Sequence, residues 1–266
     1  MKNSMNHVNK TLYIPLYGKA YVSKKGLFLH DAKAEEIWQA EQFPLKGKSR
    51  SKYLAYYMGI RSAVFDAWVK QQMDNADDAV VIHIGCGMDS RVLRVGESRH
   101  IWYDVDFPEV IAERRRYYAE DFRYQMLAGD ARDPEAWLSQ IPQSKAAIVV
   151  MEGVSMYMTE DELRAVLGAI DRHFDKAALL MDCYTAFAAK MSKYKNPVND
   201  VGVTLVHGID RPHVLQSGAI RFVKQHEMTP RDYIDQLHGL EKSIFAGLYA
   251  GQLSKKLYRL YEFEKT

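Results

Sequence analysis

Two glycines followed by a distant acidic residue form the feature of this sequence with the clearest chemical meaning. Gly85 and Gly87 end and follow an apolar run, AVVIHIG, and Asp106 ends the next run, HIWYDVD. Glycines between a strand and a helix let the backbone turn sharply and approach a ligand closely. An acid about 20 residues further on can accept both hydroxyls of an adenosine ribose. The spacing predicts a nucleoside site, with a plain strand-to-helix turn as the alternative.

The kind of nucleoside depends on the position after these glycines. In dinucleotide-binding proteins a third glycine lets the helix approach the pyrophosphate, and here Ser90 occupies that position. A sulfonium amino acid does not need this close approach. The pattern therefore favours such a cofactor over a dinucleotide, and a nicotinamide-dependent oxidoreductase stays as an alternative.

Two further carboxylates end later apolar runs. Asp130, in LAGDARD, could accept the amino group of an adenine while the Ala131 amide meets a ring nitrogen. Its alternative role is to cap the helix that begins near Pro134. Glu152, in VVMEG, would face the crevice where open α/β sheets bind ligands. It could hold an ammonium group there, or it could form a structural ion pair.

Several other side chains are weaker candidates. Arg61 could clamp a carboxylate with its planar guanidinium, or it could be a solvated charge on its helix. Candidate groups for a second substrate are Tyr157, Tyr184, His207 and His213. No group of Cys and His residues has metal-ligand spacing, so we expect no structural metal. The residues do not identify a catalytic group.

The elements that must position these residues follow from the alternation of apolar runs and helical stretches. Strands are predicted at 79–85, 100–106, 124–130, 146–152 and 178–184, and later at 220–228 and 256–265. Apolar strands separated by helices indicate a parallel sheet that is covered on both faces. We therefore expect a doubly wound, seven-stranded, mostly parallel α/β sheet. The usual arrangement in this fold class sets one of the two late strands antiparallel.

The helices and the domain organisation are predicted from the same pattern. Thr159 and Glu162 form a capping box at the start of one helix, and Thr229 is expected to cap a long helix that begins at Pro230. We expect one domain in three segments: a helical N-terminal extension (1–78), a cofactor-binding core (79–185), and a small lid with the last strands (186–266).

Composition limits the class of protein. The chain has 266 residues, 47% hydrophobic, and a net charge of +2, which gives no electrostatic case for nucleic acid or an anionic membrane as partner. The N-terminus lacks the apolar region of a signal peptide, and no stretch approaches the roughly 18 apolar residues of a membrane span. Cys86 and Cys183 lie in apolar runs and read as buried free thiols. We expect a cytoplasmic protein.

At these positions the sequence resembles the leucine carboxyl methyltransferase family, and within it a bacterial branch of polyketide O-methyltransferases. The matching segments cover nearly the whole chain and appear in family order: PLYGKAYVSKKGLFLHDAKAEEI, IRSAVFDAWV, IGCGMDSRVLR, DVDFPEVIAERR, GDARD, MEGVSMYMTEDEL and GIDRPHVL. The resemblance implies a class I, Rossmann-like methyltransferase that uses S-adenosylmethionine.

The resemblance also implies a role for each candidate. Arg61 would bind the carboxylate of the cofactor, with Lys19 near the same group, and Glu152 would take the amino-acid end. Asp106 would bind the ribose in preference to Asp104. The remaining implied contacts are the methionine part at Gly85 and Gly87 and the adenine at Asp130 and Ala131.

Three activities and one binding role are compatible with these residues. The first is O-methylation of a hydroxyl or carboxylate on a small molecule; a hydroxyl would need a base such as His207, whereas a carboxylate would need none. The second is methylation of a protein's terminal carboxylate, for which Arg211 and Arg221 are candidate anchors. The third is nicotinamide-dependent oxidoreduction, and the last is nucleoside binding without turnover.

Overall fold

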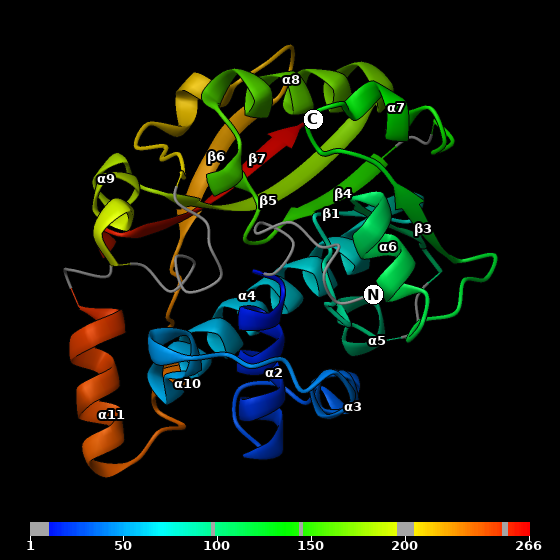
Figure 1. Cartoon of the computed structure of the whole chain (residues 1–266). Coiled ribbons are helices and arrows are strands. Elements are labelled where there is room, and N and C mark those ends of the chain that lie inside the picture. The colour runs from blue at the N-terminus through cyan, green and yellow to red at the C-terminus, as the bar shows by residue number, and fades with distance from the viewer. Residues whose placement is uncertain (1–10, 97–98, 144–145, 196–204, 252–254) are drawn as a thin grey trace.

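The protein folds around one twisted sheet of seven strands in the order β3-β2-β1-β4-β5-β7-β6 (Figure 1). This computed structural model describes residues 11–96, 99–143, 146–195, 205–251 and 255–266. The strands are β1 (Ala79–Ile84), β2 (Ile101–Asp106), β3 (Tyr124–Ala128), β4 (Ala146–Met151), β5 (Lys176–Tyr184), β6 (Arg221–His226) and β7 (Tyr258–Lys265). All seven predicted strands are present.

Strand direction also follows the prediction. The pairs β3–β2, β2–β1, β1–β4 and β4–β5 are parallel, and β7 is antiparallel to both β5 and β6. The structure therefore confirms the seven-stranded, mostly parallel α/β fold. Because β7 runs in reverse, its first residue, Tyr258, pairs with the last residue of β5, Tyr184. Both lie at the edge of the sheet where β1 to β4 end.

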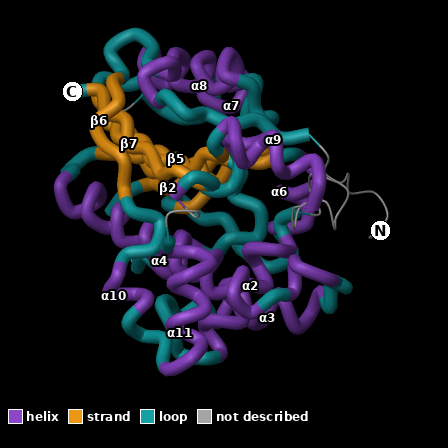
Figure 2. The backbone as a smooth tube through the Cα atoms, turned by 90° about the vertical axis from the view of Figure 1, so that its left-hand side faces the viewer, coloured by secondary structure: helices purple, strands orange, loops and turns teal. Residues whose placement is uncertain are grey.

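The sheet separates two hydrophobic cores, and the alternation of side chains along the strands assigns residues to each. In β1, Val81 belongs to one core, whereas Ile82 and Ile84 belong to the other. The second core contains Trp137 of α7 (Pro134–Leu138) and Leu167 of α8 (Glu160–His173). Figure 2 shows the strands between α7 and α8 on one side and α2, α3 and α4 on the other.

The N-terminal segment is helical, as predicted, but its longest helix is buried on more than one side. The elements are α2 (Tyr13–Lys24), α3 (Ala32–Glu41), η1 (Gly47–Arg50) and α4 (Lys52–Asn75). Helices α2 and α4 pack closely, because Gly18 and Gly59 have no Cβ. A Cβ on Gly59 would lie 2.6 Å from Val22 Cγ2, and one on Gly18 would lie 2.6 Å from Met58 Cβ. The sheet covers another side of α4, so α4 is a central helix rather than a surface one.

Helices follow β1, β2 and β4, in agreement with the predicted alternation of strands and helices. They are α5 (Arg91–Arg94), α6 (Pro108–Arg114) and α8. The capping box of α8 is confirmed: the Thr159 side chain accepts from the Glu162 amide, and the Glu162 carboxylate accepts from the Thr159 amide. The stretch PEVIAERRRYYAEDF (108–122) predicts a longer helix than α6, which ends at Arg114.

The prediction of one long helix after Pro230 is wrong. The segment instead forms α10 (Arg231–Ile234), α11 (Gly239–Phe245) and a π-helical turn, Ala246–Ala250. Gly239 has a φ of +54°, a left-handed conformation that interrupts the helix. Thr229 does not cap α10, because its hydroxyl donates to the Tyr249 carbonyl, and Pro230 occupies the N-cap position.

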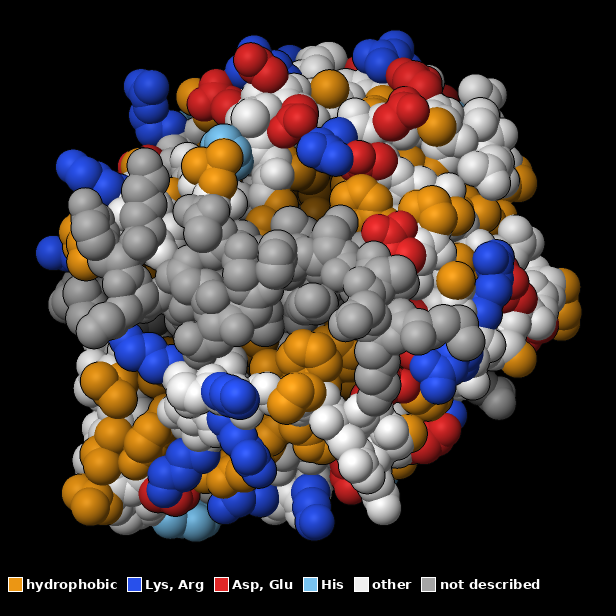
Figure 3. Space-filling view, viewed as in Figure 1, with side chains coloured by type: hydrophobic (Ala, Val, Ile, Leu, Met, Phe, Trp, Pro, Cys, Tyr) orange, Lys and Arg blue, Asp and Glu red, His pale blue; other side chains and the backbone are white. Residues whose placement is uncertain are grey.

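The remaining elements are α9 (Ala186–Lys195) and η4 (Pro212–Leu215). The segment AFAAKMSKYKNPVND predicts that α9 ends near Pro197, a position outside the described residues. On the face seen in Figure 3, acidic and basic side chains are interspersed, in keeping with the small net charge. Within the described part of the chain, no helix combines the length and the apolar character that crossing a bilayer requires.

Candidate active site

A cavity of about 710 Å³ lies at the carboxyl ends of the parallel strands. Its walls come from the N-terminal helices, from the loops after β1 to β4, and from the C-terminal segment. Ligands of open α/β sheets bind at this edge, and the volume falls within the usual range for small-molecule sites.

The two glycines after β1 shape the floor of the cavity. Gly85 and Gly87 have φ values of +67° and +51°, so both adopt left-handed backbone conformations. A Cβ on Gly85 would lie 2.0 Å from Val154 Cγ2. The Gly87 amide donates to Asp106 Oδ2 over 2.7 Å, which ties the glycine turn to the end of β2.

The two aspartates of β2, Asp104 and Asp106, have different surroundings. Asp106 lines the cavity, and its carboxylate accepts from the amides of Gly87 and Phe107. Burial raises the pKa of Asp106 to about 6. Asp104 is fully buried, pairs with Arg114 and accepts from the Tyr124 hydroxyl over 2.6 Å. Only Asp106 of this pair borders the cavity, in agreement with the preference that the sequence indicated.

Asp130 and Ala131 also line the cavity, on the β3 side. The Asp130 carboxylate pairs with Arg132, with 2.5 Å between Oδ2 and Nη2, and this hydrogen bond lowers the pKa of Asp130. Asp133, not Asp130, takes the N-cap position of α7. The alternative prediction that Asp130 caps this helix is therefore wrong.

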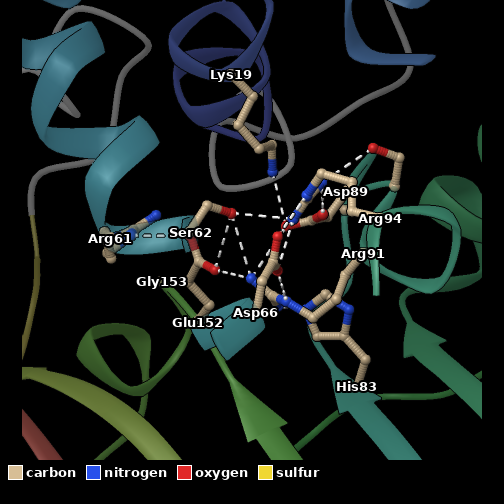
Figure 4. A network of polar contacts seen from close by, with 12 residues as sticks. Lys19, Arg61, Ser62, Asp66, His83, Asp89, Arg91, Arg94, Glu152 and Gly153 are labelled. Carbon is tan, nitrogen blue, oxygen red and sulfur yellow. Dashed lines mark hydrogen bonds and ion pairs between the residues drawn. The ribbon is translucent and has the colours of Figure 1, made fainter. Parts of the chain in front are cut away.

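Glu152 and Arg61 meet between β4 and α4 (Figure 4). Arg61 Nε donates to Glu152 Oε1 over 3.0 Å, and Arg61 Nη1 donates to Asp182 Oδ2 over 2.9 Å. Arg91 also pairs with Glu152. Burial opposes ionisation of the glutamate, but Arg61 and Arg91 outweigh it and hold the pKa of Glu152 at about 2. Arg61 is therefore a buried, cavity-lining cation, and the prediction of a solvated helix charge is wrong.

A buried network of charges extends from this pair, and sequence reasoning missed most of it (Figure 4). Lys19 Nζ lies 2.7 Å from Asp89 Oδ2, and Asp89 Oδ1 lies 2.8 Å from Arg94 Nη1. The members not predicted are Asp31, Asp66, Asp89, Arg91, Arg94 and Asp182. The segment MDSRVLR carries three of them, and its two arginines in a short apolar helix were the available signal.

Ser90, at the position of the third glycine, belongs to the same network. It is fully buried, and its hydroxyl donates to Asp31 Oδ1. Asp31 is the N-cap of α3 and accepts from the Ala34 amide. The serine therefore ties the N-terminal helices to the glycine turn, where a dinucleotide would need a bare backbone.

Tyrosines line the opposite end of the cavity. Tyr57 comes from α4, Tyr184 and Tyr258 from the paired ends of β5 and β7, and Tyr249 from the π-helical turn. The rings of Tyr184 and Tyr258 lie 4.4 Å apart in an edge-to-face arrangement. Tyr157 also lines the cavity. The cavity thus has a charged end at β1 to β4 and an aromatic end at β5 and β7.

Comparison with known proteins identifies this arrangement. Residues 9–171 match the model of the leucine carboxyl methyltransferase family. The chain belongs to this family. It is a methyltransferase.

Two relatives and one solved structure resemble this methyltransferase. The tetracenomycin polyketide synthesis O-methyltransferase TcmP of Streptomyces glaucescens is 28% identical over 260 residues, 96% of each chain. An S-adenosyl-L-methionine-dependent methyltransferase of Gibberella zeae, dpfgK, is 29% identical over 186 residues, 64% of this chain and 62% of that protein. The magnesium protoporphyrin IX methyltransferase ChlM of Synechocystis PCC 6803, solved with bound SAH, superposes with a TM-score of 0.52 at 11% identity, covering 93% of this chain and 97% of that one. The fold is that of class I methyltransferases.

Some predicted groups lie away from the cavity of this methyltransferase. His207, His213, Arg211 and Arg221 are not among its lining residues. The His213 ring packs against Phe222, and the Arg221 guanidinium donates to the carbonyls of Gly218 and Ile220. His207 as a base, and the two arginines as anchors for a peptide, therefore have no support from the geometry.

The other expectations concern thiols and metals. Cys86 and Cys183 are buried and free, as predicted. In the ranges that the structure describes, no three His, Cys, Asp or Glu side chains are grouped so that they could hold a metal ion.

Proposed function

We propose that this methyltransferase transfers a methyl group from S-adenosylmethionine to an oxygen of a small molecule, and that the oxygen belongs to a carboxylate. The observation that carries the proposal is the division of one cavity into a charged end and an aromatic end. The donor is S-adenosylmethionine, and the acceptor is a small molecule. The relatives named above, an O-methyltransferase and an S-adenosyl-L-methionine-dependent methyltransferase, support this reading.

At the charged end of the cavity, each part of S-adenosylmethionine has side chains or amides that could bind it. Asp106, at the end of β2, offers free lone pairs to ribose hydroxyls beside the left-handed turn at Gly85 and Gly87. Arg61, with Lys19 nearby, would bind the carboxylate of the amino-acid part, and Glu152 its ammonium group. Asp130 and the Ala131 amide would contact the adenine. When bound, the donor supplies a methyl group on a positively charged sulfur, and the C–S bond breaks as the new C–O bond forms.

The partners of the ionisable residues that line the cavity indicate whether the acceptor oxygen belongs to a carboxylate or to a hydroxyl. The histidine and carboxylates among the described lining residues all come from the ends of β1 to β4: His83, Asp89, Asp106, Asp130 and Glu152. Four of them have charged partners, and Asp106 accepts from two backbone amides. At the aromatic end, burial raises the pKa of Tyr57, Tyr249 and Tyr258. The carboxylates are engaged by charged or backbone groups. His83 is only 1% exposed, although its Nδ1 has no hydrogen-bond partner among the described residues. This arrangement favours an acceptor oxygen that arrives ionised, as a carboxylate does at neutral pH.

Two titrations test the donor assignment. We expect the purified protein to bind S-adenosylhomocysteine in calorimetry with micromolar affinity and not to bind NADH. Binding of NADH alone would refute the proposal and favour an oxidoreductase. Binding of neither would refute the assignment of Asp106, Arg61 and Glu152 to the donor.

A pH–rate profile tests the acceptor assignment. With labelled S-adenosylmethionine and a panel of aromatic carboxylic acids and phenols, methyl transfer to a carboxylate should show a flat kcat/KM between pH 7 and pH 9, because the acceptor is already ionised. Transfer only to phenols, with a rate that rises over this range, would show that the acceptor is a hydroxyl.

We also propose that the chain works as one methyltransferase domain in a cytoplasmic setting. All three predicted segments contribute cavity walls: Lys19 and Arg61 from 1–78, Asp106 from 79–185, and Tyr258 from 186–266. The two free thiols suit a reducing compartment. A chain truncated to residues 79–266 should fail to bind S-adenosylhomocysteine, and retained micromolar binding would refute the single-domain proposal.

A further inference from the structure

The Tyr57 hydroxyl lies buried at the wall of the cavity and has no hydrogen-bond partner among the described residues. The Tyr57 side chain is 4% exposed. Buried polar groups are nearly always hydrogen-bonded in folded proteins, and an unpaired one destabilises the fold. A ligand atom in the cavity can therefore serve as the hydrogen-bond partner of the Tyr57 hydroxyl.

The surroundings of Tyr57 define the shape and chemistry of such a ligand. The Tyr57 ring centroid lies 5.2 Å from that of Tyr249 and 5.9 Å from that of Tyr258. Tyr258 in turn meets the edge of Tyr184. Aromatic side chains favour offset or edge contacts with another aromatic ring, so these four tyrosines form walls suited to a flat, unsaturated molecule.

The position of Tyr57 relates this wall to the charged end of the cavity. Tyr57 and Arg61 are four residues apart on α4 and therefore lie on the same face of the helix. Arg61 faces Glu152 and Asp182. A molecule that meets the Tyr57 hydroxyl is therefore adjacent to the group assigned to the amino-acid end of the donor.

The protonation state of Tyr57 fixes which kind of contact it makes. Burial raises the pKa of its phenol above the ordinary value, so it stays protonated at neutral pH. The hydroxyl can then donate a hydrogen bond to an acceptor oxygen, but it cannot act as a base. This matches an acceptor that arrives ionised.

We propose that Tyr57 is the acceptor-binding residue of this methyltransferase, and that the compartment formed by Tyr57, Tyr184, Tyr249 and Tyr258 takes a flat aromatic carboxylate. The Tyr57 hydroxyl donates to an oxygen of this molecule and orients it toward the donor. The inference deepens the proposed function, because it names the acceptor class for the same cavity.

The test compares two tyrosine variants of the full chain, both saturated with S-adenosylhomocysteine. Tyr57→Phe removes the unpaired hydroxyl. Tyr261→Phe is the matched control, because Tyr261 is also buried but lies outside the cavity and donates to the Ile209 carbonyl. The probe is anthraquinone-2-carboxylate, and decanoate is the flexible, non-aromatic comparison. Affinities are measured by calorimetry and stability by thermal unfolding.

We expect the wild type to bind the aromatic probe at least tenfold more tightly than decanoate. Tyr57→Phe should weaken probe binding about tenfold, in line with the loss of a hydrogen bond to a charged group. It should leave S-adenosylhomocysteine affinity unchanged and should not lower the melting temperature. Tyr261→Phe should lower the melting temperature and leave probe affinity unchanged.

Other outcomes contradict the inference in distinguishable ways. Equal probe affinity in Tyr57→Phe and wild type, no probe binding to the loaded wild type, or equal binding of probe and decanoate would each overturn it. None of these would affect the proposed function while S-adenosylhomocysteine still binds. Loss of S-adenosylhomocysteine binding by the wild type would instead overturn the proposed function itself.

Discussion

Arg61 and Glu152 are 91 residues apart in the sequence and are joined by a 3.0 Å hydrogen bond between Nε and Oε1. The arginine comes from the helix that precedes the sheet, and the glutamate follows β4. This pair places a buried cation and a buried anion side by side at the cavity, which suits the two charges of an amino-acid group.

Arg61→Lys should weaken S-adenosylhomocysteine binding about tenfold and 5′-methylthioadenosine binding less than twofold. Lysine keeps the positive charge beside Glu152 and Asp182 but loses the planar fork that grips a carboxylate. Methylthioadenosine lacks the amino-acid end, so the substitution should have little effect on its affinity. Calorimetry on both ligands provides the measurement, with Arg99→Lys, an exposed arginine, as control. An equal loss of affinity for the two ligands would show that Arg61 does not bind the amino-acid part of the donor.

Asp106 should make donor binding depend on pH. Its pKa is raised by burial to about 6, and the ionised form is the one that accepts ribose hydroxyls. Affinity for S-adenosylhomocysteine should be constant above this pH and should fall by up to about tenfold for each pH unit below it. Asp106→Asn should bind more weakly at pH 7.5 and lose this dependence. A variant with the same pH profile as the wild type would show that another group titrates.

Glu152→Gln should lower stability in a way that depends on pH. The pKa of Glu152 is held at about 2, below the ordinary 4.5, so its stabilising contribution is complete above pH 4.5 and is lost as pH falls toward 2. This contribution is on the order of 3 kcal/mol. Urea unfolding should therefore show a larger gap between wild type and variant at pH 7 than at pH 3. A gap that does not change with pH would mean that the arginine pairs do not shift this carboxyl group.

Gly85→Ala should destabilise the protein and disturb the floor of the cavity. The residue has a φ of +67°, and a Cβ would approach Val154 Cγ2 to 2.0 Å. A left-handed conformation costs a non-glycine residue roughly 1–2 kcal/mol, and the contact with Val154 adds to this. Gly247→Ala is the control, because no atom of the described residues lies within 4 Å of its Cβ position. Thermal unfolding should show a lower melting temperature for the first variant alone, and equal temperatures for the two would contradict the argument.

Local patterns were reliable where the cause of the structure is itself local. The seven strands and the capping box at Thr159 and Glu162 follow from short-range spacing. The antiparallel direction of β7 was expected from the usual arrangement of this fold class. The prediction failed where a tertiary contact prevailed. Thr229 bonds to the Tyr249 carbonyl instead of capping a helix. The helix after Pro230 ends at Ile234, and the next helix begins at the left-handed Gly239.

The sequence by itself determined the sheet, the glycine turn after β1 and the acids that end successive strands, because each depends on residues close together in the chain. The tertiary structure decided which of these side chains are available to a ligand. Asp104 is taken up by Arg114 and Tyr124 whereas Asp106 borders the cavity, and Arg61 is buried against Glu152 rather than solvated. Only folding brings Tyr57, Tyr249 and Tyr258 together, because charge pairing and burial depend on neighbours that lie far apart in the sequence.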